Sequence, residues 1–281
     1  MQKIALITDS SCDLNQSTLD KFNIKLLPFR IIFNDNEYLD RITINSKDLF
    51  NLLKTQIPTT SLPDIEYSSK IFENLIAENY THVIIITVSA NSSGCFNSIR
   101  LLSEHYPEIN SYIFDSKTIG YPVGAIATEV GKLINNNYTF ENIISNLENI
   151  RSKTHGFVTF PSLKYLRAGG RIGRVSGAIA ETLNLKPIIS SDEDGFLYSY
   201  AKARGRKQSL NKLKQILMSY LDKGKCRVWI LNGDADEESN EFLNSVQTHE
   251  NITKISLETI GACTGVHTGP GSIGICVLEE Y

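Results

Sequence analysis

Short apolar runs that alternate with helical segments constrain the fold of this chain more than any other feature of its sequence. Residues 3–8 and 82–88 are apolar, β-branched runs of the kind that forms buried strands, and each is followed by a small polar loop and a helical pattern. The same order recurs over residues 112–114 and 120–135. Because parallel strands need crossover helices between them, this alternation predicts an α/β fold with a parallel sheet and helices on both faces.

The composition changes after Arg151, where hairpins begin to mix with helices. We therefore expect an α/β domain over residues 1–151 and a smaller α+β domain over residues 152–281. In the first half the patterns predict a strand over 26–33, a loop with two prolines over 58–63, and helices over 14–22, 44–53, 65–79 and 96–105. In the second half they predict helices over 162–168, 177–183, 206–223 and 237–247, strands over 186–190, 196–201, 227–231, 254–259 and 273–278, and a glycine-rich segment over 261–271.

Composition excludes several classes of protein. With 41% hydrophobic residues among 281, the chain can bury a core, and its net charge of −3 provides no positive field for nucleic acid or an anionic membrane. The longest nearly uncharged apolar stretch, residues 83–88, is too short to span a bilayer, and the first residues show no signal-peptide pattern. We expect a cytoplasmic protein that contacts membranes at most transiently. Five widely spaced cysteines argue against structural disulfides and zinc, so we expect no metal and no cofactor.

Two loops rich in hydroxyl groups are candidates for anion binding. The segment 89–94, Ser-Ala-Asn-Ser-Ser-Gly, precedes a helix and offers hydroxyl and backbone donors together with the positive helix end. The segment 59–61, Thr-Thr-Ser, lies on the proline-flanked loop. Taken alone, the first segment is equally well explained as a capped helix start. For the polar segments 9–11 and 115–117 we expect helix capping before any ligand role.

A histidine and a basic cluster add to these loops. His267 lies between Gly265 and Gly269, which allow close backbone approach to a ligand, but no Gly-x-Ser-x-Gly motif accompanies it, so a hydrolase is disfavoured. A stretch of eleven residues without an acid contains four basic side chains that suit a phosphate or acidic patch of a partner. These four are Lys164, Arg167, Arg171 and Arg174.

Seven motifs follow one another along nearly the whole chain. They are Ile7-Thr8-Asp9-Ser10-Ser11, Pro58-Thr59-Thr60-Ser61-x-Pro63, Ser93-Gly94, Asp115-Ser116-Lys117, Leu163-Lys164-Tyr165-Leu166-x-x-Gly169-Gly170-Arg171-Ile172, Leu185-Lys186-Pro187-Ile188 and His267-Thr268-Gly269-Pro270-Gly271. Their order and spacing resemble the DegV family of bacterial fatty-acid-binding proteins, the lipid-carrying subunits of fatty acid kinase.

The resemblance implies that one acyl chain is enclosed in an apolar tunnel, which the second domain completes, and that its carboxylate lies near the domain junction. It also implies that the carboxylate is approached by Thr60, Ser61, Ser93, Gly94 and His267. A separate ATP-using kinase subunit would then convert the presented carboxylate into an acyl phosphate, so this chain would not itself be an enzyme. Two departures from the family pattern, Leu62 in place of Gln and Cys95 in place of Thr, bear on which acyl chain is preferred.

The basic cluster is expected to lie outside this tunnel. A guanidinium inside an acyl tunnel would carry a large desolvation cost, so we place Arg171 on the surface that meets the kinase, with Arg167 and Arg174 extending the patch.

Two other functions remain open at this point. The first half also resembles the dihydroxyacetone kinase fold, which would suit a stand-alone phosphoryl-transfer enzyme acting on a small hydroxy or keto substrate. Only Asp9 and Asp115 are placed to hold the metal that such an enzyme needs. The second alternative is an esterase that uses Ser93 as its nucleophile.

Overall fold

The computed structural model describes all residues except 1, 35, 174, 176–184 and 281. Its first half is built on a four-stranded sheet in the order β2-β1-β6-β7, in which all neighbouring strands are parallel. The strands are β1 (Ile4–Asp9), β2 (Ile24–Leu27), β6 (His82–Thr87) and β7 (Asn110–Asp115). The predicted α/β fold with a parallel sheet is therefore confirmed.

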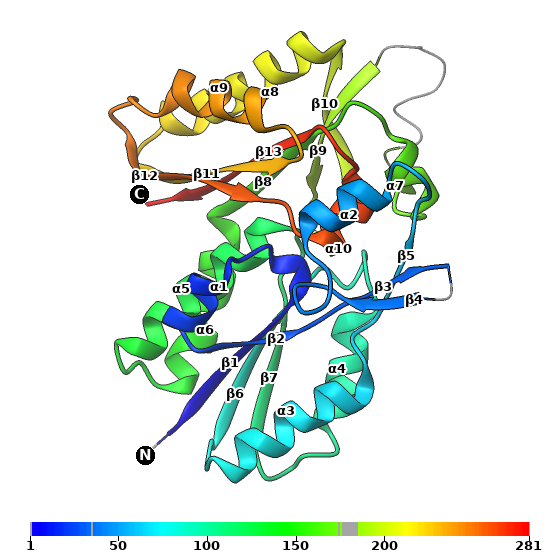
Figure 1. The fold of residues 1–281 in the computed structure, drawn as a ribbon. Coiled ribbons are helices and arrows are strands. Elements are labelled where there is room, and N and C mark those ends of the chain that lie inside the picture. The colour runs from blue at the N-terminus through cyan, green and yellow to red at the C-terminus, as the bar shows by residue number, and fades with distance from the viewer. Residues whose placement is uncertain (1, 35, 174, 176–184, 281) are drawn as a thin grey trace.

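Helices cover both faces of this sheet (Figure 1). Successive side chains of β1 point to opposite faces of the sheet, and both faces are apolar. Leu6 packs into one apolar cluster, while Ala5 and Ile7 pack into another. The first cluster is completed by α1 (Gln16–Lys21), α5 (Tyr121–Asn135) and α6 (Phe140–Ser152), and the second by α3 (Ile65–Ala77) and α4 (Cys95–Ser103).

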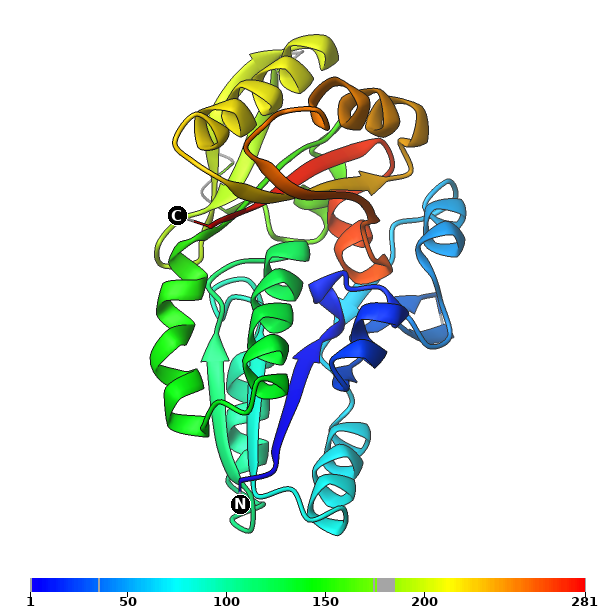
Figure 2. The ribbon, with the colours of Figure 1, turned by 90° about the vertical axis from the view of Figure 1, so that its left-hand side faces the viewer.

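The second half is a six-stranded sheet in the order β10-β9-β8-β13-β11-β12, in which β11 and β12 are the parallel pair. Its strands are β8 (Thr154–Thr159), β9 (Leu185–Ser191), β10 (Leu197–Arg204), β11 (Cys226–Gly233), β12 (Ile252–Thr259) and β13 (Ser272–Glu279). Helices α8 (Arg206–Leu221) and α9 (Asp236–Val246) cover the face of this sheet that points away from the first half (Figures 1 and 2).

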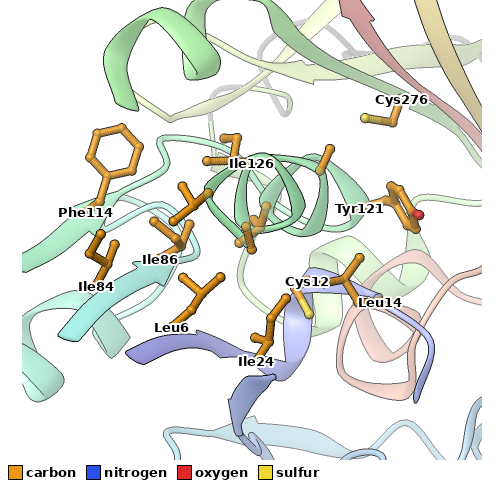
Figure 3. Close-up of a cluster of buried hydrophobic side chains, with 14 of the residues drawn as sticks. Leu6, Cys12, Leu14, Ile24, Ile84, Ile86, Phe114, Tyr121, Ile126 and Cys276 are labelled. Carbon is orange, nitrogen blue, oxygen red and sulfur yellow. The ribbon is translucent and has the colours of Figure 1, made fainter. Parts of the chain in front are cut away.

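Helix α5 lies between the two sheets and belongs to the core of both. Its apolar side chains share one cluster with Leu6 of β1 and with Cys276 of β13 (Figure 3). The ring of Tyr121 at the start of α5 lies 5.4 Å from the ring of Trp229 on β11, measured between centroids. This continuous core fixes the position of one sheet relative to the other.

Smaller elements surround the junction between the two halves. A three-stranded antiparallel sheet in the order β4-β3-β5 lies beside it with a short helix. These elements are β3 (Arg30–Phe33), β4 (Asn36–Leu39), β5 (Thr59–Ser61) and α2 (Ser46–Leu52). Two more helices from the second half, α7 (Lys164–Ala168) and α10 (Ala262–Thr268), pack against each other at the same junction (Figure 1).

Several expected elements need correction. The prediction of a single strand over residues 26–33 is wrong. Pro28 separates β2 from β3, and these two strands belong to different sheets. The loop over 58–63 contains β5, which its prolines still permit because β5 is an edge strand. The glycine-rich segment 261–271 contains α10, and the pattern did not predict α6 or β8. The helix expected over 177–183 lies outside the described residues. None of the described helices is long and apolar enough to cross a membrane.

Candidate functional site

A cavity lies where the carboxyl edge of the parallel sheet meets the six-stranded sheet. Such an edge is the usual position of ligands in open α/β folds. Most of its wall is apolar and comes from both halves of the chain. The apolar lining residues are Phe29, Val88, Ile119, Pro122, Phe157, Val158, Phe160, Leu166, Ile189, Leu197, Leu231 and Ile260.

Five polar side chains from the two hydroxyl-rich loops, the basic cluster and the histidine also line this cavity. They are Thr60, Ser92, Ser93, Arg171 and His267. They come from β5, from the loop before α4, from the segment after α7 and from α10, which are far apart in the sequence. The remaining polar lining residues are Ser11, Asp13, Thr118, Ser190, Ser191, Thr264 and Thr268.

Thr60 and His267 form a direct pair in this wall. Oγ1 of Thr60 lies 3.0 Å from Nε2 of His267, while Nδ1 of His267 has no hydrogen-bond partner among the described residues. Burial lowers the pKa of the imidazole to about 4, with a further lowering from the positive charge of Arg171. The ring is therefore neutral at pH 7.

Close packing between α7 and α10 sets the position of the imidazole. A Cβ on Gly169 would lie 2.1 Å from Nδ1 of His267, and a Cβ on Gly269 would lie 2.1 Å from the ring of Tyr165. Gly269 also has a φ of +71°, which favours glycine. These two glycines let the two helices approach closely enough to place His267 at the cavity.

The loop that carries Ser93 is held by two carboxylates at the ends of the neighbouring strands, Asp9, which is buried, and Asp115, which is half-buried. Oδ2 of Asp9 accepts from the Val88 backbone N–H at 2.7 Å, and Oδ1 of Asp115 accepts from the Ala90 N–H at 3.1 Å. Oγ of Ser93 accepts from the N–H of Cys95 at 3.2 Å, which leaves the Ser93 O–H to donate to a ligand.

Asp9 also has the capping role expected for it. Its Oδ1 accepts from the backbone N–H of Ser11 at the start of the 3-10 helix Ser10–Cys12. Complete burial raises the pKa of Asp9 to about 6.

Arg171 does not lie outside the cavity as expected, because its side chain lines it. Its Nη1 donates to the carbonyl of Gly169 at 2.6 Å and its Nε faces the carbonyl of Ser92 at 3.4 Å. The chain turns back after α7, since the Arg171 N–H donates to the carbonyl of Leu166. The two carbonyl oxygens offset the desolvation cost on which the expectation was based. Arg167 is exposed on α7, whereas Arg174 lies outside the described residues.

Two other expected carboxylate contacts, Ser61 and Gly94, are not among the lining residues. Neighbouring residues in a strand point to opposite faces, so β5 can turn Thr60 toward the cavity only by turning Ser61 away. Oγ of Ser61 accepts from Nη2 of Arg30 at 3.0 Å. Gly94 is exposed and faces Leu62, whose Cδ1 would lie 3.7 Å from an added Cβ.

The geometry favours binding over the chemistry of a serine esterase. An esterase needs a base within hydrogen-bonding distance of its nucleophile, but Nε2 of His267 is paired with Thr60, and the bond that Ser93 makes is with a backbone N–H. Within the described part of the chain, no three His, Cys, Asp or Glu side chains are grouped so as to hold a metal ion.

Comparison with known sequences shows that the chain is similar to one group of proteins. The family model described as "Uncharacterised protein, DegV family" matches residues 3–280. A DegV domain-containing protein of Clostridium perfringens is 48% identical over 280 residues, which cover 100% of both chains. A second relative, a DegV domain-containing protein of Clostridium acetobutylicum, is 41% identical with the same coverage.

Solved structures show the same architecture. The crystal structure of DegV from Bacillus subtilis, described as a fatty acid binding protein, has a TM-score of 0.92 at 25% identity and covers 100% of both chains. The crystal structure of a stearic acid-binding protein from Eubacterium ventriosum has a TM-score of 0.89 at 29% identity, over 100% of this chain and 99% of that one.

Proposed function

This chain belongs to the DegV family, and from that premise we propose that it binds one long-chain fatty acid in the cavity at the junction of its two halves. In this proposal the acyl chain lies along the apolar wall. The carboxylate accepts hydrogen bonds from Ser93 and from the Thr60–His267 pair, which has one proton left to donate after its internal hydrogen bond is made. The proteins from Bacillus subtilis and Eubacterium ventriosum, described as binding fatty acid and stearic acid, support it by analogy.

The apolar wall supports an acyl ligand on energetic grounds. Burial of about fourteen methylenes at about 0.8 kcal/mol each contributes roughly 11 kcal/mol before the cost of association. Binding of this strength needs no chemical step. The polar side chains are then required only to orient and select the head group.

The single observation that carries the proposal is the Thr60–His267 pair in an otherwise largely apolar wall. The Thr60–His267 pair with its one remaining proton, the Ser93 hydroxyl and the nearby Arg171 guanidinium form a group of donors suited to one carboxylate. A neutral lipid head group would leave some of these donors unpaired, which costs binding free energy.

We propose further that the protein presents this carboxylate to a separate, ATP-using fatty acid kinase subunit. In that complex a carboxylate oxygen would attack the γ-phosphorus of ATP, the bond from this phosphorus to the bridging oxygen would break, and acyl phosphate and ADP would form. Arg167 is exposed on α7, four residues before Arg171 of the cavity wall, and its free positive charge supports a docking role for the surface beside the cavity. Nothing in the sequence has the pattern of a Walker loop.

Native mass spectrometry of the purified protein tests the binding proposal. We expect an added mass in the range of long-chain fatty acids, or its appearance after stearic acid is added at equimolar concentration. Denaturation should release the ligand unmodified, because no covalent step is proposed. A protein that carries no lipid and takes up no added stearic acid would refute the proposal. Supplying the kinase subunit and ATP then tests presentation, through formation of acyl phosphate.

A further inference from the structure

The strand that carries Thr60 is held weakly by its own backbone. Strand β5 has three residues and lies at the edge of its sheet, where it pairs with β3 alone among the described strands. Pro58 and Pro63 lie on either side of it and cannot donate backbone hydrogen bonds. A three-residue edge strand does not by itself fix the direction of a side chain, yet Thr60 must point accurately at His267 to form the pair.

Arg30 supplies the missing restraint on this strand. Its Nη2 donates to Oγ of Ser61 at 3.0 Å, and its Nε donates to the carbonyl of Leu62 at 2.9 Å. Arg30 and Ser61 are register partners in the β3–β5 pair, so the guanidinium reaches directly across the ladder. The Arg30 side chain is 29% exposed, and its third contact, with Glu37 at 3.4 Å, is a longer ion pair on the outer side.

The other face of the same ladder meets the helix that carries His267. Ile31 is the register partner of Thr60, is completely buried and shares an apolar cluster with Val266 of α10. Ile31 therefore sets the distance between the ladder and α10. The Arg30 guanidinium sets the rotation of β5 about its own axis, because its two hydrogen bonds hold Ser61 and Leu62, the two residues that follow Thr60.

We propose that Arg30 is a positioning residue for the carboxylate site, which acts by clamping Ser61 and Leu62 so that the Thr60 hydroxyl stays directed at His267 and at the ligand. The proposal rests on the proposed function, since the ligand is the fatty acid carboxylate. It also assigns Ser61 a role as an anchor and not as a contact of the carboxylate. A planar guanidinium with two donors in fixed geometry suits this clamp better than an ammonium does.

Head-group selectivity separates a positioning role from a merely structural one. We would measure the dissociation constants of stearic acid and of its methyl ester for the wild type, Arg30→Gln and Glu37→Gln. Arg30→Gln should reduce the preference for the acid by about tenfold, the effect of one impaired hydrogen bond to a charged group. Its affinity for the ester should stay unchanged. Glu37→Gln removes the ion pair but not the clamp, so it should retain the wild-type preference.

A second measurement does not require the ligand. The ¹⁵N resonance of His267 Nε2 in the ligand-free protein reports its contact with Thr60, and Arg30→Gln should shift this resonance in the same direction as Thr60→Val does. Arg30→Lys keeps one donor and should give a smaller shift. Should Arg30→Gln leave the Thr60–His267 contact and the acid preference intact, or weaken acid and ester equally, Arg30 is not a positioning residue. If the wild type binds acid and ester equally, the proposed function fails, while the His267 resonance still decides the role of Arg30.

Discussion

Nε2 of His267 lies 3.0 Å from the hydroxyl oxygen of Thr60, although 207 positions separate the two residues in the sequence. Thr60 belongs to an edge strand of the first half, and His267 belongs to α10 in the second half. The polar part of the cavity therefore exists only when the two halves are packed together. Because α5 shares its core with both sheets, this packing is maintained without the ligand.

Replacing Thr60 by valine should weaken the binding of stearic acid by about tenfold, because valine keeps the shape of threonine but removes a hydrogen bond to a charged group. Binding of methyl stearate should change little. Thr59→Val is a matched control, since Thr59 is the preceding residue of the same strand and is exposed on the opposite face. Isothermal titration calorimetry measures both variants. Equal losses in the two variants would show that the effect comes from the strand and not from the hydroxyl group.

Removing the hydroxyl of Ser93 should also lower the affinity for stearic acid, by about tenfold or more. Ser93 lines the cavity, and its oxygen accepts from the Cys95 N–H, so its O–H remains available to the carboxylate. Ser103→Ala is the control, because the Ser103 hydroxyl donates to the Arg100 carbonyl on α4 away from the cavity. Thermal unfolding followed by circular dichroism verifies that both variants fold. Wild-type affinity in Ser93→Ala would remove Ser93 from the site.

Fatty acid binding should be accompanied by proton uptake at acidic pH. The pKa of His267 in the free protein is lowered to about 4, chiefly by burial, and a carboxylate bound beside the ring favours its protonated form. The complex then binds more protons than the free protein, so affinity should increase as the pH falls from 7 toward 5. Calorimetry in buffers of different ionisation enthalpy measures the number of protons taken up. His267→Gln should abolish this uptake, and an undiminished uptake in that variant would assign it to another group.

The alternation of apolar runs was sufficient to predict the α/β fold, because each buried strand and crossover helix has its own local pattern. The same local reasoning failed where tertiary contacts decide the structure. Strand β5 is only three residues long and exists because β3 provides a partner, and α10 forms in a glycine-rich segment because those glycines allow close packing against α7 and α2. Neither partner is visible in the local sequence.

In the candidate site, too, local sequence patterns identified some residues, and tertiary contacts decided the placement of the others. Hydroxyl-rich loops and a histidine between glycines marked Thr60, Ser93 and His267, and all three line the cavity. The orientation of Ser61 could not be predicted, because the two prolines in residues 58–63 indicate a loop, to which the alternation of a strand does not apply. Arg171 was misplaced because the carbonyl oxygens that accept its hydrogen bonds belong to Gly169 and Ser92, and the contact with Ser92 joins distant parts of the chain.

The stability of the protein should decrease as the pH rises from 6.5 to 8. Burial raises the pKa of Asp13 to about 7, far above its ordinary value of 3.8, so the native state holds a proton that the unfolded state has released. This contribution is complete below pH 3.8 and declines as the pH rises toward 7. Its last part, roughly 1 kcal/mol, is lost between pH 6.5 and 8. Chemical denaturation at several pH values measures it. The stability of Asp13→Asn should depend less on pH, and a slope equal to that of the wild type would contradict this assignment.

Replacing Arg171 by alanine should change both the affinity for the carboxylate head group and the pKa of His267. A residue that contacts only the kinase subunit would change neither. The positive charge of Arg171 contributes to the low pKa of His267, so its removal should raise this pKa from about 4 toward the ordinary value of 6.5, although burial still holds it below. Loss of a guanidinium from the cavity wall should also weaken stearic acid binding by about tenfold.

Arg167→Ala is the matched control, because Arg167 is exposed on α7 and does not line the cavity, so it should leave the His267 pKa and the affinity unchanged. Arg167→Ala should lower only the rate of acyl-phosphate formation in the presence of the kinase subunit and ATP. NMR titration of His267 and calorimetry on both variants decide the matter: if Arg171→Ala retains the wild-type pKa and affinity, Arg171 serves the partner and not the carboxylate.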